Sequence, residues 1–169
     1  MARVLITGAE SGLGLSLVRA FTEDGDNVSV LCRSASPELN ALTPTLHIDV
    51  DVTNHVAINR AANAIGEKPI DILINNAGVM IQDNIDQIDP AAVRQQFEVN
   101  ALAPLNVLLA FRHRLQAGSR VINISSRLGS ISDNVSGDDY GYRMSKAAQN
   151  MLTSNLAVEL SKEDICVVA

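Results

Sequence analysis

The feature that most constrains this chain is a short β-branched run near its start that leads directly into a glycine-rich turn. Residues Arg3–Thr7 are typical of a buried strand, and the turn Thr7-Gly8-Ala9-Glu10-Ser11-Gly12-Leu13-Gly14 follows at once. An apolar 3.6-residue pattern over residues 13–21 then predicts a helix. Strand, tight turn and helix in this order are typical of the opening of a parallel α/β sheet.

Apolar runs alternate with helical patterns along the rest of the chain. We expect strands at 27–32, 45–50, 70–75 and 121–125, and helices at 53–65 (with Thr53 as N-cap), 90–116 and 142–161. Near-continuous apolar strands that alternate with helices are typical of a parallel sheet that is covered on both sides. The sequence therefore predicts an α/β fold, a Rossmann-like doubly wound parallel sheet with helices on both faces.

The chain stops within the apolar run 165–169, where a further strand begins. We therefore expect residues 1–169 to form a single dinucleotide-binding domain that is incomplete at its C-terminus, with the last strands missing. An incomplete sheet of this kind would leave the fifth strand near an exposed edge and an apolar patch uncovered.

Charge and hydropathy exclude several classes of protein. The 169 residues contain 13 Lys and Arg against 19 Asp and Glu, a net charge of −6, and 47% of them are hydrophobic. This composition excludes intrinsic disorder, and the scattered basic residues argue against nucleic acid or an anionic membrane as a partner. The longest apolar stretch, 101–111, is too short to cross a bilayer, so we expect no membrane segment.

The cysteines and histidines suggest neither disulfides nor a metal site. Cys32 and Cys166 each lie inside an apolar run, so we expect both to be small core residues in a reduced, cytoplasmic protein. His47, His55 and His113 lack the spacing of metal ligands, and no metal is expected.

The glycines of the first turn fit the approach of a pyrophosphate group. Gly8 and Gly12 permit a tight turn, and Gly14 allows the helix to lie near the strand and to direct its first N–H groups at the phosphates. A second small-residue turn, Asn75-Asn76-Ala77-Gly78, ends the strand at 70–75, at the sheet edge where doubly wound folds bind ligands. Each turn alone is also compatible with ordinary turn chemistry.

Tyr142 and Lys146 are one helical turn apart and share a helix face. An ammonium group about 4 Å from a phenol favours the phenolate by about 1 kcal/mol in water and by about 4 kcal/mol at an effective dielectric constant near 20. The pair is therefore suited to acid–base chemistry in a partly closed cleft, and an exposed surface pair is the alternative. Tyr140 has no basic residue four positions later.

Asn100 lies inside the helix expected at 90–116, four residues before Pro104. Because proline has no N–H group, the Asn100 carbonyl loses its regular donor and is free for water or a side chain. We expect a kink next to the cleft, with a solvent-facing irregularity as the alternative. Ser125 and Ser126 end the fifth strand, where a hydroxyl could bind a carbonyl oxygen or merely cap a turn.

Together and in this order, the motifs resemble the short-chain dehydrogenase/reductase family, and within it the C-factor-like, or sniffer-like, carbonyl reductases. The resemblance runs from residue 2 to residue 169. The motifs that carry it are TGAESGLG at 7–14, DVT at 51–53, NNAG at 75–78, Asn100, ISSRLGS at 124–130, and Tyr142 with Lys146.

The resemblance implies a catalytic tetrad of Asn100, Ser126, Tyr142 and Lys146. In such enzymes the tyrosine donates a proton to the substrate carbonyl, the serine positions that carbonyl, and the lysine assists the tyrosine and binds the nicotinamide ribose. The asparagine carbonyl holds a water molecule of the proton relay. Ser126 is preferred to Ser125 because the family's serine is followed by two residues and then a glycine, here at position 129.

The resemblance also implies which residues contact the cofactor. Asp51 would bind the adenine, and Asn76 and Gly78 would line the adenosine and ribose side. The full expected set is Gly8, Ser11, Gly12, Leu13, Gly14, Arg33, Asp51, Val52, Asn76, Ala77, Gly78, Tyr142 and Lys146.

The end of the second strand predicts the choice of cofactor. An NAD enzyme normally has a carboxylate there, whereas this chain has Cys32 and then Arg33, which favours a 2′-phosphate. We therefore expect NADP(H) to be preferred over NAD(H). Glu10 stands where the family usually has a neutral residue, and it would repel the pyrophosphate unless it points to solvent or pairs with a base.

These observations lead to two functional hypotheses. The first is an NADPH-dependent oxidoreductase that reduces the ketone or aldehyde carbonyl of a small substrate to an alcohol by hydride transfer, with Tyr142 as general acid. The alternative is a nucleotide-binding or signalling protein of the same fold, with weak or no catalysis because the C-terminal substrate segment is absent. A fragment of a longer enzyme is a third reading. The resemblance also implies a homodimer that pairs through the helices at 90–116 and 142–161.

Overall fold

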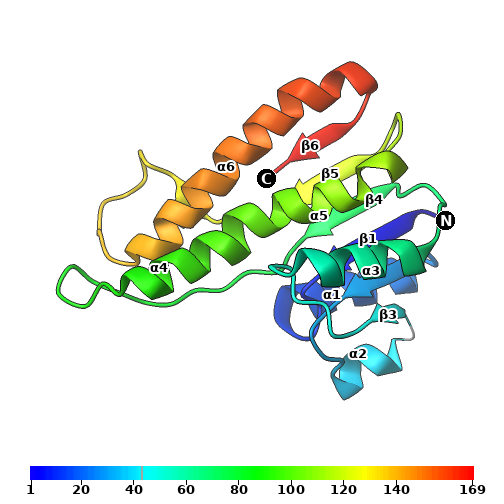
Figure 1. Cartoon of the computed structure of the whole chain (residues 1–169), viewed down its shortest axis with the longest axis horizontal. Coiled ribbons are helices and arrows are strands. Elements are labelled where there is room, and N and C mark those ends of the chain that lie inside the picture. The colour runs from blue at the N-terminus through cyan, green and yellow to red at the C-terminus, as the bar shows by residue number, and fades with distance from the viewer. Residues whose placement is uncertain (43) are drawn as a thin grey trace.

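The protein is described from a computed structural model, which covers residues 1–42 and 44–169. Its parallel strands form one sheet in the order β3-β2-β1-β4-β5-β6 (Figure 1). The strands are β1 (Arg3–Thr7), β2 (Asn27–Leu31), β3 (Thr45–His47), β4 (Ile72–Asn75), β5 (Arg120–Asn123) and β6 (Cys166–Val168). The strand order reverses at β1, as it does in a doubly wound sheet, so the expected fold class is confirmed.

Helices follow most of the strands. The α-helices are α1 (Gly12–Glu23), α2 (Pro37–Ala41), α3 (His55–Ile65), α4 (Pro90–Phe97), α5 (Ala103–Phe111) and α6 (Tyr140–Leu160). A π-helical turn, η1 (Glu98–Leu102), joins α4 to α5, and the short 3₁₀ turns are η2 (Arg112–Arg114), η3 (Arg127–Gly129) and η4 (Ser161–Glu163).

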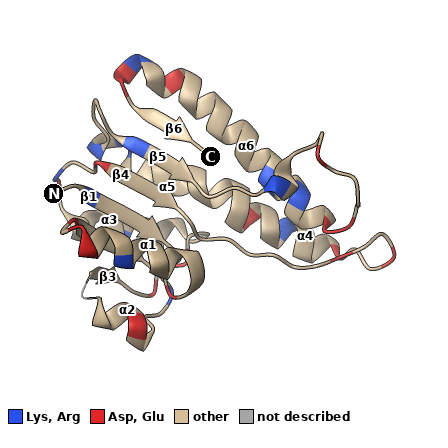
Figure 2. Cartoon of the chain, turned by 180° about the vertical axis from the view of Figure 1, so that it is seen from behind, with Lys and Arg blue, Asp and Glu red and all other residues tan. Residues whose placement is uncertain are grey.

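Strand β1 illustrates why helices cover both faces of the sheet. Leu5 packs in one apolar cluster with residues of α3, α5 and α6, whereas Val4 and Ile6 pack in another with residues of α1 and α2. A strand with apolar side chains on both faces is kept out of water only between two helical layers. Accordingly, α3 and α5 lie in front of the sheet in Figure 1, and α1 lies in front in the reverse view of Figure 2.

The helices differ from the sequence-based expectations at several points, and α6, for example, begins at Tyr140 and not at residue 142. Helix α3 begins at His55, and its N-cap is Asn54, whose side chain accepts the N–H groups of residues 56 and 57. Thr53 is therefore not the cap; its N–H and hydroxyl bind Asp51 instead. Helix α2 was not expected, although Ser36 caps it and Pro37 occupies its first position.

The helical run expected at 90–116 extends to residue 114, but it changes type next to Pro104. In η1 the N–H of Ala103 bonds to the Glu98 carbonyl, five residues earlier. The expected irregularity is thus a π turn, a form that often marks functional sites. Asn100 lies in this turn and is fully buried, so the alternative of a solvent-facing irregularity is wrong.

The final strand, β6, pairs with β5 from Cys166 to Val168 and forms the edge of the sheet. Strand β5 therefore lies one strand from the edge, near it as expected. Cys166 is exposed, which contradicts its expected place in the core, whereas Cys32 is buried.

Charged residues of both signs are dispersed over the molecule (Figure 2).

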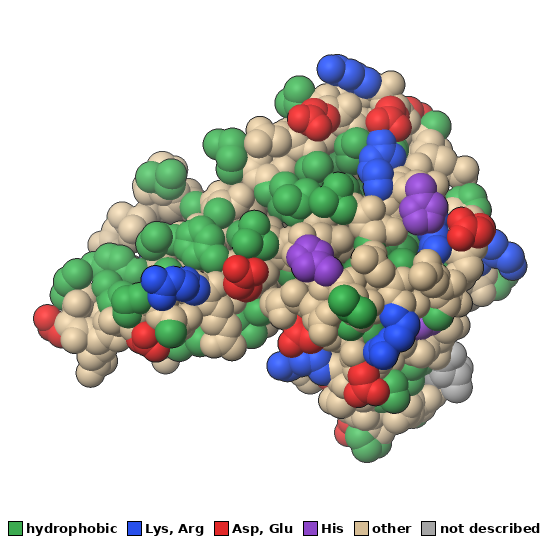
Figure 3. Space-filling model, viewed as in Figure 1, with side chains coloured by type: hydrophobic (Ala, Val, Ile, Leu, Met, Phe, Trp, Pro, Cys, Tyr) green, Lys and Arg blue, Asp and Glu red, His purple; other side chains and the backbone are tan. Residues whose placement is uncertain are grey.

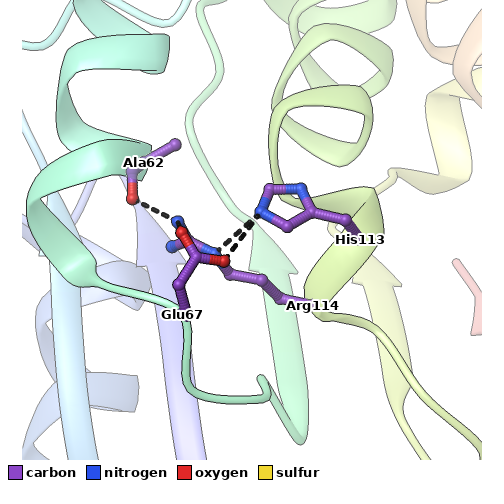
Figure 4. Close-up of polar contacts among 4 residues, drawn as sticks. All are labelled: Ala62, Glu67, His113 and Arg114. Carbon is purple, nitrogen blue, oxygen red and sulfur yellow. Dashed lines mark hydrogen bonds and ion pairs between the residues drawn. The ribbon is translucent and has the colours of Figure 1, made fainter.

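Arg114 is a charged residue whose side chain is buried, with only 1% of its surface exposed. Its Nη2 donates to the Ala62 carbonyl at 2.6 Å, its Nε donates to His113 Nε2 at 3.2 Å, and Glu67 lies 3.9 Å away (Figure 4). Arg114 thus binds a free carbonyl of the last turn of α3 and ties that helix to η2.

Within the part of the chain that the structure describes, no helix combines the length and the apolar character needed to span a membrane.

Candidate cofactor and active site

A cavity of about 760 Å³ opens at the carboxyl ends of β1, β2 and β4. It brings together ten of the expected cofactor contacts: Gly8, Ser11, Leu13, Gly14, Arg33, Asp51, Val52, Asn76, Ala77 and Gly78. Gly12, Tyr142 and Lys146 are not among its lining residues. The site predicted from separate motifs is therefore largely one continuous cleft.

The lining also includes residues that sequence reasoning did not select as cofactor contacts. Most are neighbours of the motifs, but some come from the helical run α4–η1 and carry no motif that could have identified them. The additional residues are Glu10, Leu31, Cys32, Ser34, Val50, Thr53, Val79, Gln95, Glu98 and Val99.

The two glycine-containing turns pack directly against each other. Gly8 has φ +66°, and a Cβ atom there would lie 2.7 Å from the Cα of Ala77. A Cβ on Gly14 would overlap the Gly8 carbonyl oxygen and lie 2.5 Å from Asn76 Nδ2. Glycine is required at both positions because backbone and side-chain atoms of the neighbouring turn occupy the space.

Asn76 and Thr7 hold these turns together. Asn76 Nδ2 donates to the carbonyl oxygens of Thr7 and Gly8 at 3.0 and 2.6 Å. The Thr7 hydroxyl oxygen accepts the N–H groups of Asn76 and Ala77, each at 3.1 Å. The NNAG turn is thus a brace for the glycine loop, and not merely a surface turn.

The N-terminus of α1 faces this cleft with unused donors. Its N-cap, Ser11, makes no side-chain capping bond, and the space around Gly12 is open. The first N–H groups of a helix lack partners within the helix and attract anions. Together these features suit the binding of a phosphate.

At the other side of the loop, Glu10 and Arg33 meet at the end of β2. Glu10 Oε1 accepts the backbone N–H of Arg33 at 3.0 Å, so this carboxylate is directed towards the β2 end. Burial and the charge of Glu10 raise the pKa of the Cys32 thiol to about 11. The hydrogen bonds from Thr53, helped by the charge of Arg33, lower the pKa of Asp51, while partial burial opposes that shift.

Lys146 is buried on α6, with 4% of its surface exposed. Its Nζ donates to the Ile124 carbonyl at 2.7 Å and to Gln149 Oε1 at 3.0 Å, and it lies 5.8 Å from the ring centroid of Tyr142. Burial lowers the pKa of Lys146 to about 8. The burial of Lys146 contradicts the alternative of an exposed surface pair.

The two serines after β5 have different partners. Ser125 donates its hydroxyl to Asn150 at 2.6 Å, whereas the Ser126 hydroxyl oxygen accepts the N–H of Leu128. The Ser126 proton has no acceptor among the described residues. A Cβ on Gly129 would lie 2.9 Å from the Lys146 backbone, so this turn packs directly on α6.

The buried side chain of Asn100 makes three hydrogen bonds. Its Oδ1 accepts the Val79 N–H at 2.8 Å, and its Nδ2 donates to the Val79 carbonyl at 2.8 Å and to Ser145 Oγ at 3.0 Å. A Cβ on the adjacent Gly78 would lie 3.3 Å from Asn100 Oδ1 and 3.8 Å from Lys146 Nζ. Gly78, which lines the cavity, therefore lies next to the buried side chains of Asn100 and Lys146, although neither of these two residues lines the cavity itself.

The strand order, the glycine turn at the N-terminus of α1 and the buried lysine behind Gly78 define a Rossmann-like oxidoreductase. Its family follows from the sequence: the short chain dehydrogenase family model matches residues 2–169, and the chain belongs to that family.

Named relatives agree with this assignment. The chain is 36% identical to 1-hydroxy-2-glutathionyl-2-methyl-3-butene dehydrogenase of Rhodococcus sp. (strain AD45), over 99% of this chain and 75% of that protein. It is 41% identical to C-signal of Myxococcus xanthus over 103 residues, 59% of this chain and 62% of that protein. The structure is also similar to an NADPH-bound carbonyl reductase from chicken fatty liver, with a TM-score of 0.86 and 31% identity over 96% of this chain and 75% of that one.

Proposed function

We propose that this chain is an NADP(H)-dependent oxidoreductase that reduces a ketone or aldehyde carbonyl of a small substrate to an alcohol, with Tyr142 as general acid. Residues 1–169 would act as one dinucleotide-binding domain. The observation that carries the proposal is the course of the cleft. It runs from the α1 N-terminus to Gly78, and Gly78 lies next to the buried side chains of Asn100 and Lys146.

The residues of the cleft fit a dinucleotide. The unused N–H groups at the start of α1, where Ser11, Leu13 and Gly14 line the cavity, would receive the pyrophosphate, and Asp51 would receive the adenine. The nicotinamide ribose would approach Lys146 past Gly78, because Gly78 lines the cavity and a Cβ there would lie 3.8 Å from Lys146 Nζ. When bound, the nicotinamide supplies the hydride.

The chain's own residues would manage the proton. Tyr142 would donate its phenolic proton to the carbonyl oxygen as that oxygen gains negative charge. Ser126 would hydrogen-bond the same oxygen, because its hydroxyl oxygen already accepts the Leu128 N–H and its proton is free to be donated. The Lys146 ammonium, 5.8 Å from the Tyr142 ring centroid, would favour the phenolate formed in the step.

The preference for NADP(H) rests on Arg33, whose side chain is exposed at the rim of the cleft. A guanidinium there can bind a 2′-phosphate through charge-assisted hydrogen bonds. The NADPH-bound carbonyl reductase from chicken fatty liver supports this choice by its similarity. Glu10 is bonded to the Arg33 N–H and would oppose the preference in part, because its carboxylate repels a phosphate.

The cofactor proposal is tested by titrating the protein with NADPH and NADH. We expect tighter binding of NADPH, and Arg33→Ala should remove the difference. Equal or tighter binding of NADH by the unaltered protein would overturn the proposal.

The catalytic proposal is tested by following NADPH oxidation with small ketones and aldehydes. Tyr142→Phe should abolish turnover while NADPH still binds. Tyr140→Phe is the matched control, because Tyr140 begins the same helix but has no lysine one turn later, and it should keep the activity. Equal losses in both variants would contradict the role of Tyr142.

A second function is supported by the similarity to C-signal, whose name denotes a signal. In this reading the chain binds the nucleotide without appreciable turnover. NADPH binding with no oxidation of any carbonyl substrate would favour this second function over the first.

We also propose that two copies pair through α4–α5 and α6. Exposed apolar side chains on these helices include Leu102, Leu109, Met151 and Val158. Figure 3 shows hydrophobic side chains gathered over this part of the molecule. Sedimentation equilibrium should give twice the chain mass of 18.0 kDa, and a monomer at micromolar concentration would contradict the pairing.

A further inference from the structure

Gln149 is a buried amide that no motif explains. It lies on α6 three residues after Lys146 and is fully buried. Its Oε1 accepts a hydrogen bond from Lys146 Nζ at 3.0 Å, while its Nε2 has no partner among the described residues. A buried amide with a free N–H group is costly, since nearly all buried polar groups are hydrogen-bonded.

The oxygen of the Gln149 amide is hydrogen-bonded and the nitrogen is not, and this difference indicates what the side chain does. A glutamine kept only for packing would be replaced by leucine of similar size at no cost in hydrogen bonds. Here the oxygen is bonded to an ammonium and the nitrogen is bonded to nothing. Among the described residues, the amide group of Gln149 therefore bonds to Lys146 alone.

The lysine in turn is fixed by two acceptors. Its ammonium has three N–H groups, and two of them point at the Ile124 carbonyl and at Gln149 Oε1. The third N–H group has no acceptor among the described residues, and a Cβ on the cavity-lining Gly78 would lie 3.8 Å from Nζ. An acceptor fixed by α6 itself thus determines the direction in which the lysine presents its remaining donor.

We propose that Gln149 is a positioning residue, which holds the Lys146 ammonium in place beside the cavity-lining Gly78. This inference rests on the proposed function, in which Lys146 acts on the nicotinamide ribose and on Tyr142. Gln149 does not line the cavity and would act through Lys146 alone.

The two acceptors that bond to the Lys146 ammonium, the Ile124 carbonyl and Gln149 Oε1, are both uncharged. Lys146 forms no ion pair with the described residues, and burial is the cause of its lowered pKa. An acceptor dipole favours the charged amine, so Gln149 opposes the effect of burial. The titratable or charged side chains on α6 and on the elements packed against it are Arg94, Glu98, Arg127, Tyr140, Tyr142, Arg143, Glu159, Lys162, Glu163 and Cys166.

The test is a pH titration of the lysine side chains by NMR in the absence of cofactor. The chain contains three lysines, Lys68, Lys146 and Lys162, so ¹³Cε labelling should give separable signals. Gln149→Leu should lower the titration midpoint of Lys146 by about one pH unit, and Gln149→Glu should raise it, because the first removes an acceptor and the second adds a charge. Lys68 and Lys162 should not move.

Asn155→Leu supplies the control, because Asn155 is an exposed amide on the same helix and should leave the midpoint of Lys146 unchanged. Urea unfolding of each variant shows whether it is folded. If Gln149→Leu is folded and Lys146 titrates as before, the amide is merely structural and the inference is overturned. If Gln149→Glu is folded and the titration midpoint of Lys146 is unchanged, the inference is overturned as well, even if Gln149→Leu fails to fold.

NADPH titrations separate this inference from the proposed function. Gln149→Leu should weaken NADPH binding about fivefold at pH 8 and much less at pH 6.5, where the ammonium is mostly charged in both proteins. If the midpoint of Lys146 shifts but the unaltered protein does not bind NADPH, the proposed function fails and the positioning role stands. If NADPH binds equally to both proteins at both pH values, the positioning role fails and the proposed function stands.

Discussion

Gly14→Ala tests the close packing of the two turns that form the floor of the cleft. The added Cβ would overlap the Gly8 carbonyl oxygen and would lie 2.5 Å from Asn76 Nδ2 and 2.8 Å from the Cα of Ala9. Two of these three atoms belong to the backbone, so the overlap cannot be relieved by turning a side chain. The glycine loop must move away from α1.

The net loss of stability can be worked out from three contributions. Alanine is favoured over glycine inside a helix by about 1 kcal/mol. Overpacking costs about 1–3 kcal/mol, and weakening the bond from Asn76 Nδ2 to the Gly8 carbonyl costs about 1 kcal/mol. The expected loss in the free energy of unfolding is therefore about 1–3 kcal/mol, which for a chain of this length lowers Tm by roughly 3–10 °C.

Urea and thermal unfolding followed by circular dichroism measure this loss. A double-mutant cycle with Asn76→Ala adds a sharper readout, because removing Nδ2 relieves part of the overlap. The two losses should be non-additive, with a coupling of about 1 kcal/mol. A Gly14→Ala protein as stable as the unaltered one, or losses that simply add, would refute the packing described for these turns.

Three further predictions concern other buried groups. A thiol reagent should modify Cys166 in the folded protein, and Cys32 only on unfolding, because Cys166 is exposed and burial raises the pKa of Cys32 to about 11; equal rates would contradict this. Asn100→Ala should lower the free energy of unfolding in urea by about 2–3 kcal/mol, because it leaves the Val79 N–H and carbonyl without partners; a loss below about 0.5 kcal/mol would count against it. Burial lowers the pKa of Lys146 from its ordinary 10.5 to about 8, so the folded chain binds fewer protons than the unfolded chain between these values. The free energy of unfolding should therefore rise from pH 8 to pH 10.5 by up to about 3 kcal/mol more in the unaltered protein than in Lys146→Met. If the free energies of unfolding of the two proteins change in parallel with pH, the lowered pKa of Lys146 is excluded.

Much of the fold could be predicted because its elements carry strong local patterns. Strand β1 was predicted with its observed bounds, since β-branched residues and a glycine turn delimit it. Helix α2 was missed because five residues give no helical periodicity, although the Ser36 cap and Pro37 were visible signals. Cys166 was misjudged because an edge strand buries alternate residues, here Val167, and exposes those on either side.

The candidate site was predictable where neighbouring residues form it. The two turns and the Tyr142–Lys146 pair could be recognised because their chemistry lies within a few positions of the chain. Gln95 and Val99 could not, because they reach the cleft only where α4–η1 bonds to the segment after β4, through Asn100 and Gln96. Gln149 gave no signal, since an amide in a helical pattern is usually a solvent-facing residue.

The π turn at Glu98–Leu102 uses one residue more than regular α-helical bonding would. Deleting a single residue there would restore the ordinary ladder and rotate the preceding helix by about 100° relative to α5. Gln96, which binds the Ile81 N–H at 2.9 Å, would then leave its partner. A point substitution cannot change the register of a helix in this way, whereas the deletion of one codon can. In descendants of this gene we therefore expect the part of the cavity lined by α4–η1 to be lost through the deletion of a single codon in the π turn.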